Sequence, residues 1–213
     1  MKKLIAVSII LNVMFILLSG YIIIKKGGTS YIKRKIFIPS QDHSISYLTK
    51  KSILEVMPND SSEIIFLGSL LIDNCDWHEF FRNPNIKNRG ISGDNINGVI
   101  ERLDEVLGSF PKKVFVMLGS NDLNQNYSVG EILNNYEKLV KLIIEKSPDT
   151  KTYVQSVLPT YHDFTRDNDD IISLNAGLEK LAQNYNLNYI DLFNVFKTDT
   201  NERTLITLLM GYI

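Results

Sequence analysis

The sequence of 213 residues contains very few of the side chains that form disulfides or bind metals. Cys75 is its only cysteine, and it has three histidines. One cysteine cannot form a disulfide within the chain, and so few residues cannot reproduce the Cys and His spacings of structural zinc sites. We therefore predict no bound metal.

Basic residues are scarce beyond the N-terminus. Seven of the 23 precede Asp42, the first acidic residue, and the remaining 16 compare with 24 acidic residues. This excess of negative charge repels a phosphate backbone, so we predict no nucleic-acid partner. No G-x-G-x-x-G or Walker-type loop occurs, and nucleotide binding therefore has no support from a motif.

The N-terminal segment is the longest apolar run of the chain. Residues 4–24 carry no charge and include one strongly polar side chain, Asn12, with lysines on both sides. This length can span a bilayer, and the poor match to a cleavage site favours an uncleaved anchor over a signal peptide. We expect residues 1–26 to form one transmembrane helix with the domain outside the cytoplasm. The basic residues that follow, between 25 and 35, favour the opposite orientation.

Beyond this segment, short apolar runs alternate with stretches of helical periodicity. The apolar residues recur at helical spacing in 96–107, 132–144 and 171–185, and Ser128 with Glu131 has the pattern of a capping box. Strands buried on both faces and joined by helices imply a parallel sheet in a three-layer α/β/α sandwich, with ligands at the carboxyl ends of the strands. The five predicted strands are 64–68, 86–91, 114–118, 153–158 and 187–192.

We assign residues 63–213 to this α/β domain. Residues 27–62 contain glycines, prolines and a basic cluster, which are typical of a linker, and a short helix is expected near residues 46–56.

Polar and glycine-rich segments follow each of the first three predicted strands. They are Gly68-Ser69-Leu70-Leu71, Gly90-Ile91-Ser92-Gly93-Asp94 and Gly119-Ser120-Asn121-Asp122. Together they resemble the first three sequence blocks of the SGNH (GDSL-type) ester hydrolases. Residues 84–107 and 155–159 are similar to the branch that contains carbohydrate O-acetylesterases and platelet-activating-factor acetylhydrolases. The resemblance covers about residues 62–195.

The resemblance implies a flavodoxin-like SGNH hydrolase fold and a serine acyl-enzyme mechanism that needs no cofactor. It also implies an acyl ester of a carbohydrate or small molecule as the partner. The oxyanion hole would comprise the N–H of the nucleophile, the N–H of Gly90 and the amide of Asn121, with Gly68, Gly119 and Asp122 in support. Taken singly, Gly90 and Asn121 are equally typical of turns.

The nucleophile block departs from the family pattern. Leu70 stands where the family has its serine, and leucine cannot attack a carbonyl. Ser69 is a candidate substitute, although it is displaced by one residue along a turn. Cys75 is a weaker candidate because no histidine is adjacent to it.

The general base of the family is absent as well. Its terminal Asp-x-x-His has no counterpart, because no histidine follows His162, and His43 and His78 are far from the predicted strand ends. Asp191 ends the fifth predicted strand but has no histidine three residues later, which favours a capping role. We therefore expect a C-terminally truncated domain, and a frameshift before Met210 is our hypothesis for the missing block.

Three functions follow from these features. The first is a carboxylic ester hydrolase that is inactive or impaired in this chain. The alternative is a non-catalytic surface ligand-binding domain that keeps the oxyanion pocket. The third is residual hydrolysis by Ser69 with His162 or a water molecule, since oxyanion donors and binding alone leave about 10³-fold catalysis in enzymes stripped of their triad.

Overall fold

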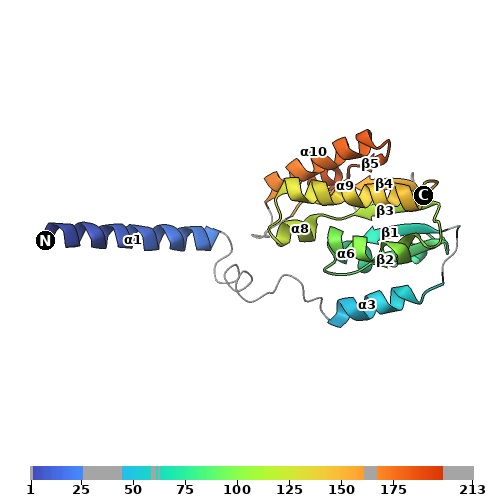
Figure 1. Cartoon of the computed structure of the whole chain (residues 1–213), viewed down its shortest axis with the longest axis horizontal. Coiled ribbons are helices and arrows are strands. Elements are labelled where there is room, and N and C mark those ends of the chain that lie inside the picture. Colours follow the sequence, from blue (N-terminus) through green and yellow to red (C-terminus); the bar gives the residue numbers. More distant parts are fainter. Residues whose placement is uncertain (1, 26–44, 59–60, 62, 161–166, 199–213) are drawn as a thin grey trace.

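The structure, a computed structural model, describes residues 2–25, 45–58, 61, 63–160 and 167–198. The segments predicted as the remainder of the linker and as the altered C-terminus lie outside these residues, as do His43 and His162. Figure 1 shows the N-terminal helix followed by an α/β unit.

The N-terminal segment forms helix α1, Lys2–Lys25, and exposes apolar side chains such as Leu11 and Phe15. Within the described part of the chain, no helix combines the length and the apolar character that crossing a membrane requires. The predicted transmembrane anchor therefore has no support in the structure.

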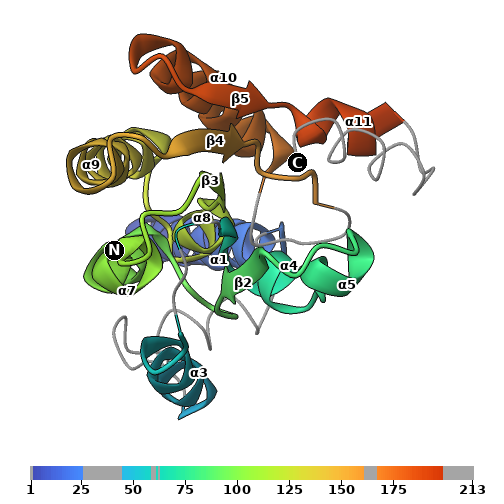
Figure 2. The ribbon, with the colours of Figure 1, turned by 90° about the vertical axis from the view of Figure 1, so that its right-hand side faces the viewer.

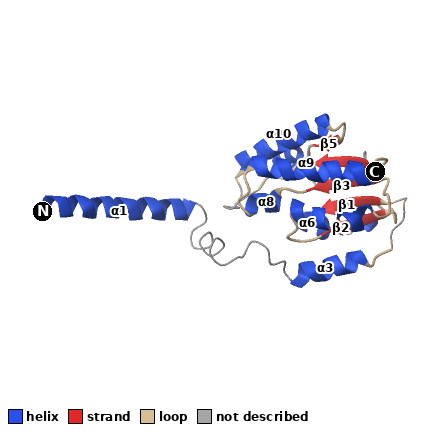
Figure 3. Cartoon of the chain, viewed as in Figure 1, coloured by secondary structure: helices blue, strands red, loops and turns tan. Residues whose placement is uncertain are grey.

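Five parallel strands form one sheet, as the sequence predicted. Their order in the sheet is β2-β1-β3-β4-β5, so β1 lies between β2 and β3 (Figure 3). β1, β3, β4 and β5 are built mainly from β-branched and aromatic residues, which favour extended backbone, whereas β2 contains only one such residue, Ile86. The strands are β1 Ile64–Gly68, β2 Ile86–Gly90, β3 Lys113–Met117, β4 Lys151–Gln155 and β5 Asn188–Ile190.

Helices cover both faces of the sheet, which confirms the three-layer sandwich (Figure 2). Ile65 and Leu67 of β1 point into one core with α6, α7, α9 and α10, whereas Ile64 and Phe66 point into a second core with α4, α5 and α11. The helices are α4 Leu70–Asp73, α5 Trp77–Phe80, α6 Ile96–Glu101, α7 Leu103–Leu107, α8 Ser120–Asn124, α9 Val129–Lys146, α10 Asn168–Asn184 and α11 Leu192–Thr198.

The helix predicted over residues 96–107 is divided at Arg102. This residue has φ −113° and ψ 16°, outside the helical region, and it ends α6 and begins α7. Its guanidinium points inward and donates to the Asp94 carboxylate and to the backbone oxygen of Arg89. The break therefore follows from a buried polar contact, which apolar periodicity does not reveal.

The short helix predicted inside the linker is present as α3, Ile45–Glu55. Its Tyr47 and Leu54 are buried and form a small core with Ile91 of the α/β unit. Residues 45–55 therefore pack against the domain.

The Asn88 side chain joins β2 to the segment after β1. Its amide nitrogen donates to the carbonyl oxygens of Ile72, Asp73 and Cys75 at 2.7–3.1 Å, and its oxygen accepts from Gly90 N–H at 2.8 Å. One side chain thus satisfies four backbone groups near the carboxyl end of the sheet.

We predict that Asn88→Ala lowers the free energy of unfolding by about 2–4 kcal/mol, because several backbone groups lose their partner at once. Urea denaturation measures this difference. Asn97→Ala, at an exposed position of α6, serves as the control and should leave stability unchanged or slightly raised. Equal effects in the two variants would contradict the assigned role of Asn88.

Candidate active site

The segments that follow β1, β2 and β3 meet at one edge of the sheet, as predicted. Gly68 is in register with Gly90 on one side and with Met117 on the other. The Ile91 N–H donates to the Gly68 carbonyl at 3.1 Å, so the first two segments are also bonded to each other. The register brings the three sequence blocks together at the edge where parallel sheets bind ligands.

Leu70 occupies the first position of α4, with its side chain 49% exposed at this edge. Helical N–H groups in a first turn have no acceptor within their own helix, so the Leu70 N–H is oriented as a donor. Ser69 is the N-cap residue of α4 and half-buried, and its hydroxyl makes no capping hydrogen bond. An exposed leucine side chain thus stands at the position that the resemblance assigns to the nucleophile.

Gly90 has a packing role in this structure. It is buried, and its N–H already donates to the Asn88 side chain. A Cβ at this position would lie 2.5 Å from the Asp73 backbone nitrogen, so only glycine lets α4 approach β2 this closely. The expected oxyanion donor is therefore engaged elsewhere.

Gly93 offers the donor that the sequence analysis assigned to Gly90. It is exposed, has φ +86°, and a Cβ built on it meets no atom within 4 Å. Among the described residues, no acceptor is recorded for its N–H. The N–H groups of the two neighbouring residues do have acceptors. Ser92 N–H donates to the Asp73 carboxylate, and Asp94 N–H donates to the Ile91 carbonyl. The sequence signal was a glycine before an aspartate in a strand-to-helix loop, a pattern that favours positive φ.

Asn121 lies in the first turn of α8, and its side chain is tied to the same loop. Its amide nitrogen donates to the Asp94 carbonyl at 2.6 Å. An amide nitrogen carries two hydrogens, so the second can still bind a ligand. Gly119 precedes it with φ +114°, where a Cβ would lie 2.9 Å from Leu174.

Asp94 itself is buried and paired. Its carboxylate accepts from Arg102 Nε at 2.9 Å and from the hydroxyl of Tyr47 at 3.3 Å. Arg102 also contacts Glu105, which pairs with Arg89. These charged side chains are almost completely buried, so each needs its partners to offset the loss of hydration.

Asp122 is buried next to Asn121, with no exposed surface. One carboxylate oxygen accepts from Ile96 N–H at 3.3 Å and so bonds to the first residue of α6. Burial raises the pKa of Asp122 to about 6, and nearby Asp94 adds to the effect. Asp122 therefore supports the loop between β2 and α6 and does not face a ligand.

No general base is identified in the described part of the chain. His78 is the one histidine there, on an exposed position of α5, and no contact between it and Ser69 is recorded. Asp191 accepts from the backbone and side-chain nitrogens of Asn194, the capping role that the sequence favoured. Cys75 is half-buried, and burial raises the pKa of its thiol. In the same residues, no cluster of His, Cys, Asp and Glu is placed to hold a metal ion.

The α/β sandwich places the segments after β1, β2 and β3 at one edge of the sheet, the arrangement that the resemblance to ester hydrolases implies. The chain belongs to the GDSL-like lipase/acylhydrolase family, whose model matches residues 69–207. This result confirms the resemblance inferred from the sequence.

Individual proteins agree with this assignment. Platelet-activating factor acetylhydrolase IB subunit alpha1 of Bos taurus is 30% identical over 103 residues, which are 46% of this chain and 44% of that protein. The match thus spans less than half of the curated relative.

Two solved structures share the fold. One from Streptococcus pneumoniae, described as a platelet activating factor, has a TM-score of 0.65 at 24% identity and covers 73% of this chain and 78% of its own. An acetyl-xylooligosaccharide esterase from Geobacillus stearothermophilus has a TM-score of 0.51 at 18% identity. The match covers 66% of this chain and 82% of that esterase.

The raised pKa of Asp122 predicts a specific dependence of stability on pH. The folded-state pKa of about 6 exceeds the ordinary value for an aspartate, about 3.9, so protonation favours the folded state. The contribution of this group to the free energy of unfolding should rise as the pH falls from 7 to about 4.

Asp122→Asn keeps an acceptor for Ile96 N–H and removes the charge. We expect it to be more stable than the natural chain at pH 7, by at most about 3 kcal/mol, and the difference to shrink toward pH 4. Urea denaturation across this pH range measures the gap. The exposed Asp149→Asn is the control, and a gap for Asp122→Asn that does not change with pH would contradict the assigned burial effect.

Proposed function

We propose that this chain is a carboxylic ester hydrolase of the serine acyl-enzyme type whose turnover is lost or severely impaired, and whose pocket still recognises an acyl ester. The observation that carries the proposal is the exposed Leu70 side chain at the nucleophile position, with the family architecture retained around it.

The proposed site has three donors for a carbonyl oxygen. They are the Leu70 N–H, the Gly93 N–H and the second hydrogen of the Asn121 amide. Donors held in place before a ligand arrives stabilise the negative charge that develops in acyl transfer. Gly93 replaces Gly90 in this assignment, because the Gly90 N–H is bonded to Asn88.

Turnover requires a nucleophile and a base in addition to these donors. Leu70 supplies no nucleophilic atom, and no general base is identified among the described residues. The Ser69 hydroxyl makes no capping hydrogen bond, but Ser69 occupies the N-cap position of α4, one residue before the proposed position of the nucleophile. A displacement of about 1 Å can lower a rate about 10²-fold, so we assign Ser69 no significant catalysis.

The similar proteins support an acetyl or other small acyl ester as the ligand class. One relative is named as an acetylhydrolase, and one structural neighbour as an esterase of acetylated xylooligosaccharides. We therefore propose an acyl ester carried by a carbohydrate or a small molecule. The chemistry of this family type requires no metal or organic cofactor.

A second function is a binding domain that holds the ester without cleaving it. The side chains of Leu70 and Leu71 are 49% and 54% exposed at the site, where an apolar acyl chain or sugar face could cover them. Affinity for the ester in the natural chain, together with no turnover even after the nucleophile and base are restored, would favour this function over a disabled hydrolase.

The test compares hydrolysis of an activated acetyl ester by the natural chain and by a repaired chain. The repaired chain carries Leu70→Ser, Leu209→Asp and Tyr212→His, which restore the nucleophile and an Asp-x-x-His spacing. We expect turnover only in the repaired chain, and adding Asn121→Ala to it should lower kcat about 10²- to 10³-fold. Activity in the natural chain that Ser69→Ala abolishes would overturn the proposal and make Ser69 the nucleophile.

From the apolar sequence of residues 4–24, we also propose that the chain is held at a membrane with its domain outside the cytoplasm. The full chain should sediment with membranes after expression, and added protease should digest the domain in intact cells. A version that starts at residue 36 should be released. A full chain recovered in the supernatant would contradict this proposal.

A further inference from the structure

Helix α3 contacts the loop that carries Gly93, although it lies before the residues that the family model matches. We call residues 91–95 the β2–α6 loop. This loop supplies one of the three proposed ligand donors, Gly93, and its Asp94 carbonyl is bonded to a second one, Asn121. What holds the β2–α6 loop therefore also places the donors.

Three contacts join α3 to this loop. The Tyr47 hydroxyl donates to the Asp94 carboxylate at 3.3 Å. Lys50 pairs with Asp73 at 2.9 Å, and the other oxygen of Asp73 accepts from Ser92 N–H at 2.9 Å. Leu54 and the Tyr47 ring pack against Ile91 in one small core. Polar and apolar contacts thus hold the loop from the same side.

Asp94 connects these contacts to the pocket. Its carboxylate accepts from both Tyr47 and Arg102, and its main-chain carbonyl accepts from the Asn121 amide. Asp94 also follows Gly93 directly in the chain, so the two residues share a peptide bond. Gly98 leaves the room that this arrangement needs, because a Cβ there would collide with the Asp94 carboxylate. A shift of Asp94 would therefore move both donors.

We propose that Tyr47 is a positioning residue for the acyl-ester pocket: through its hydrogen bond to Asp94, it fixes the orientation of the Asn121 amide and the Gly93 N–H. This inference rests on the proposed function for the identity of the two ligand donors. The placement of those donors can be measured in the free protein, independently of any ligand.

Tyrosine suits this role because its hydroxyl stays protonated. Burial and the neighbouring Asp94 carboxylate raise the pKa of the Tyr47 phenol, so it donates at any physiological pH. One oxygen of Asp94 accepts from Arg102, and the other accepts from the Asn95 N–H at 3.1 Å and from Tyr47. Tyr47 thus adds a neutral donor without adding another buried charge.

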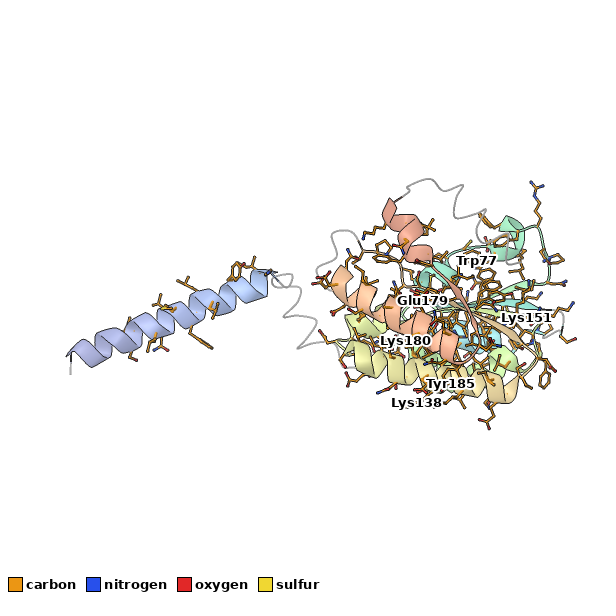
Figure 4. All side chains as sticks on the ribbon, turned by 90° about the horizontal axis from the view of Figure 1, so that it is seen from above. Trp77, Lys138, Lys151, Glu179, Lys180 and Tyr185 are labelled. Atoms are coloured by element: carbon orange, nitrogen blue, oxygen red, sulfur yellow. The ribbon has the colours of Figure 1, made fainter. Side chains whose placement is uncertain are left out.

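The test uses Tyr47→Phe in the full chain, which removes the hydroxyl and keeps the ring in the core with Leu54 and Ile91. Two controls are matched to it. Tyr185→Phe removes a hydroxyl that donates to Glu137 of α9, and Tyr185 is labelled in Figure 4. Leu54→Ala weakens the same α3 contact without touching the hydroxyl, and reports the effect of lower stability alone.

The first readout is the NMR spectrum of the free protein. We expect the Asn121 side-chain amide and the Gly93 backbone amide to change in chemical shift more in Tyr47→Phe than in either control. Changes that are equal to those in Leu54→Ala would overturn the positioning role and leave Tyr47 as a purely structural contact.

The second readout is binding of sodium acetate, a small oxyanion probe, followed by the same amide signals. We expect Tyr47→Phe to weaken binding about fivefold, the effect of one misplaced hydrogen bond. If acetate binds neither the natural chain nor the variants, the proposed acyl-ester site is refuted. The amide chemical shifts of the free protein would still decide whether Tyr47 positions Asn121 and Gly93. Unchanged affinity in Tyr47→Phe would overturn the inference.

Discussion

The buried ion pair between Arg102 and Asp94 is the interaction on which the geometry of the candidate site depends. Both side chains have no exposed surface, and their closest atoms are 2.9 Å apart. Removing one partner of such a pair typically costs about 3–5 kcal/mol, because the other charge is left buried without compensation. The pair divides one predicted helix into α6 and α7, and it holds the carbonyl that orients Asn121.

The glycines near this pair divide into two kinds, although they look alike in the sequence. Gly68 and Gly90 lie in strands, where a Cβ would collide with the neighbouring backbone, so they permit close packing of β1, β2 and α4. Gly93 lies in open space at φ +86°, where glycine permits the turn and leaves an N–H exposed. The first kind supports the site, and the second kind provides the donor.

The exposed position of Leu70 makes the fold compatible with the substitution that we propose, a leucine in place of the nucleophile. Its side chain faces solvent, and the buried core of β1 depends on residues such as Ile65, Phe66 and Leu67. A substitution at an exposed site away from caps and buried networks usually changes stability by less than about 0.5 kcal/mol. The scaffold of an acyl pocket can therefore persist without the atom that performs the chemistry.

Much of this protein follows from its sequence alone. Apolar periodicity determines the five strands and the main helices, because burial on one face or on two requires that pattern. The order of strands and helices then places the blocks after β1, β2 and β3 at one edge, and the residue at position 70 identifies the missing nucleophile.

Only the tertiary structure decided which donors are available. The Asn88 amide that accepts from the Gly90 N–H is held by carbonyls 13–16 positions earlier in the chain. The pairing of Tyr47 with Asp94 across 47 positions and the inward turn of Arg102 likewise depend on how separate segments pack. A buried polar side chain must find a partner wherever the fold supplies one, and the local sequence does not specify which partner that will be. For this reason the Gly90 N–H is bonded within the fold, and Gly93 is the donor that we propose for the site.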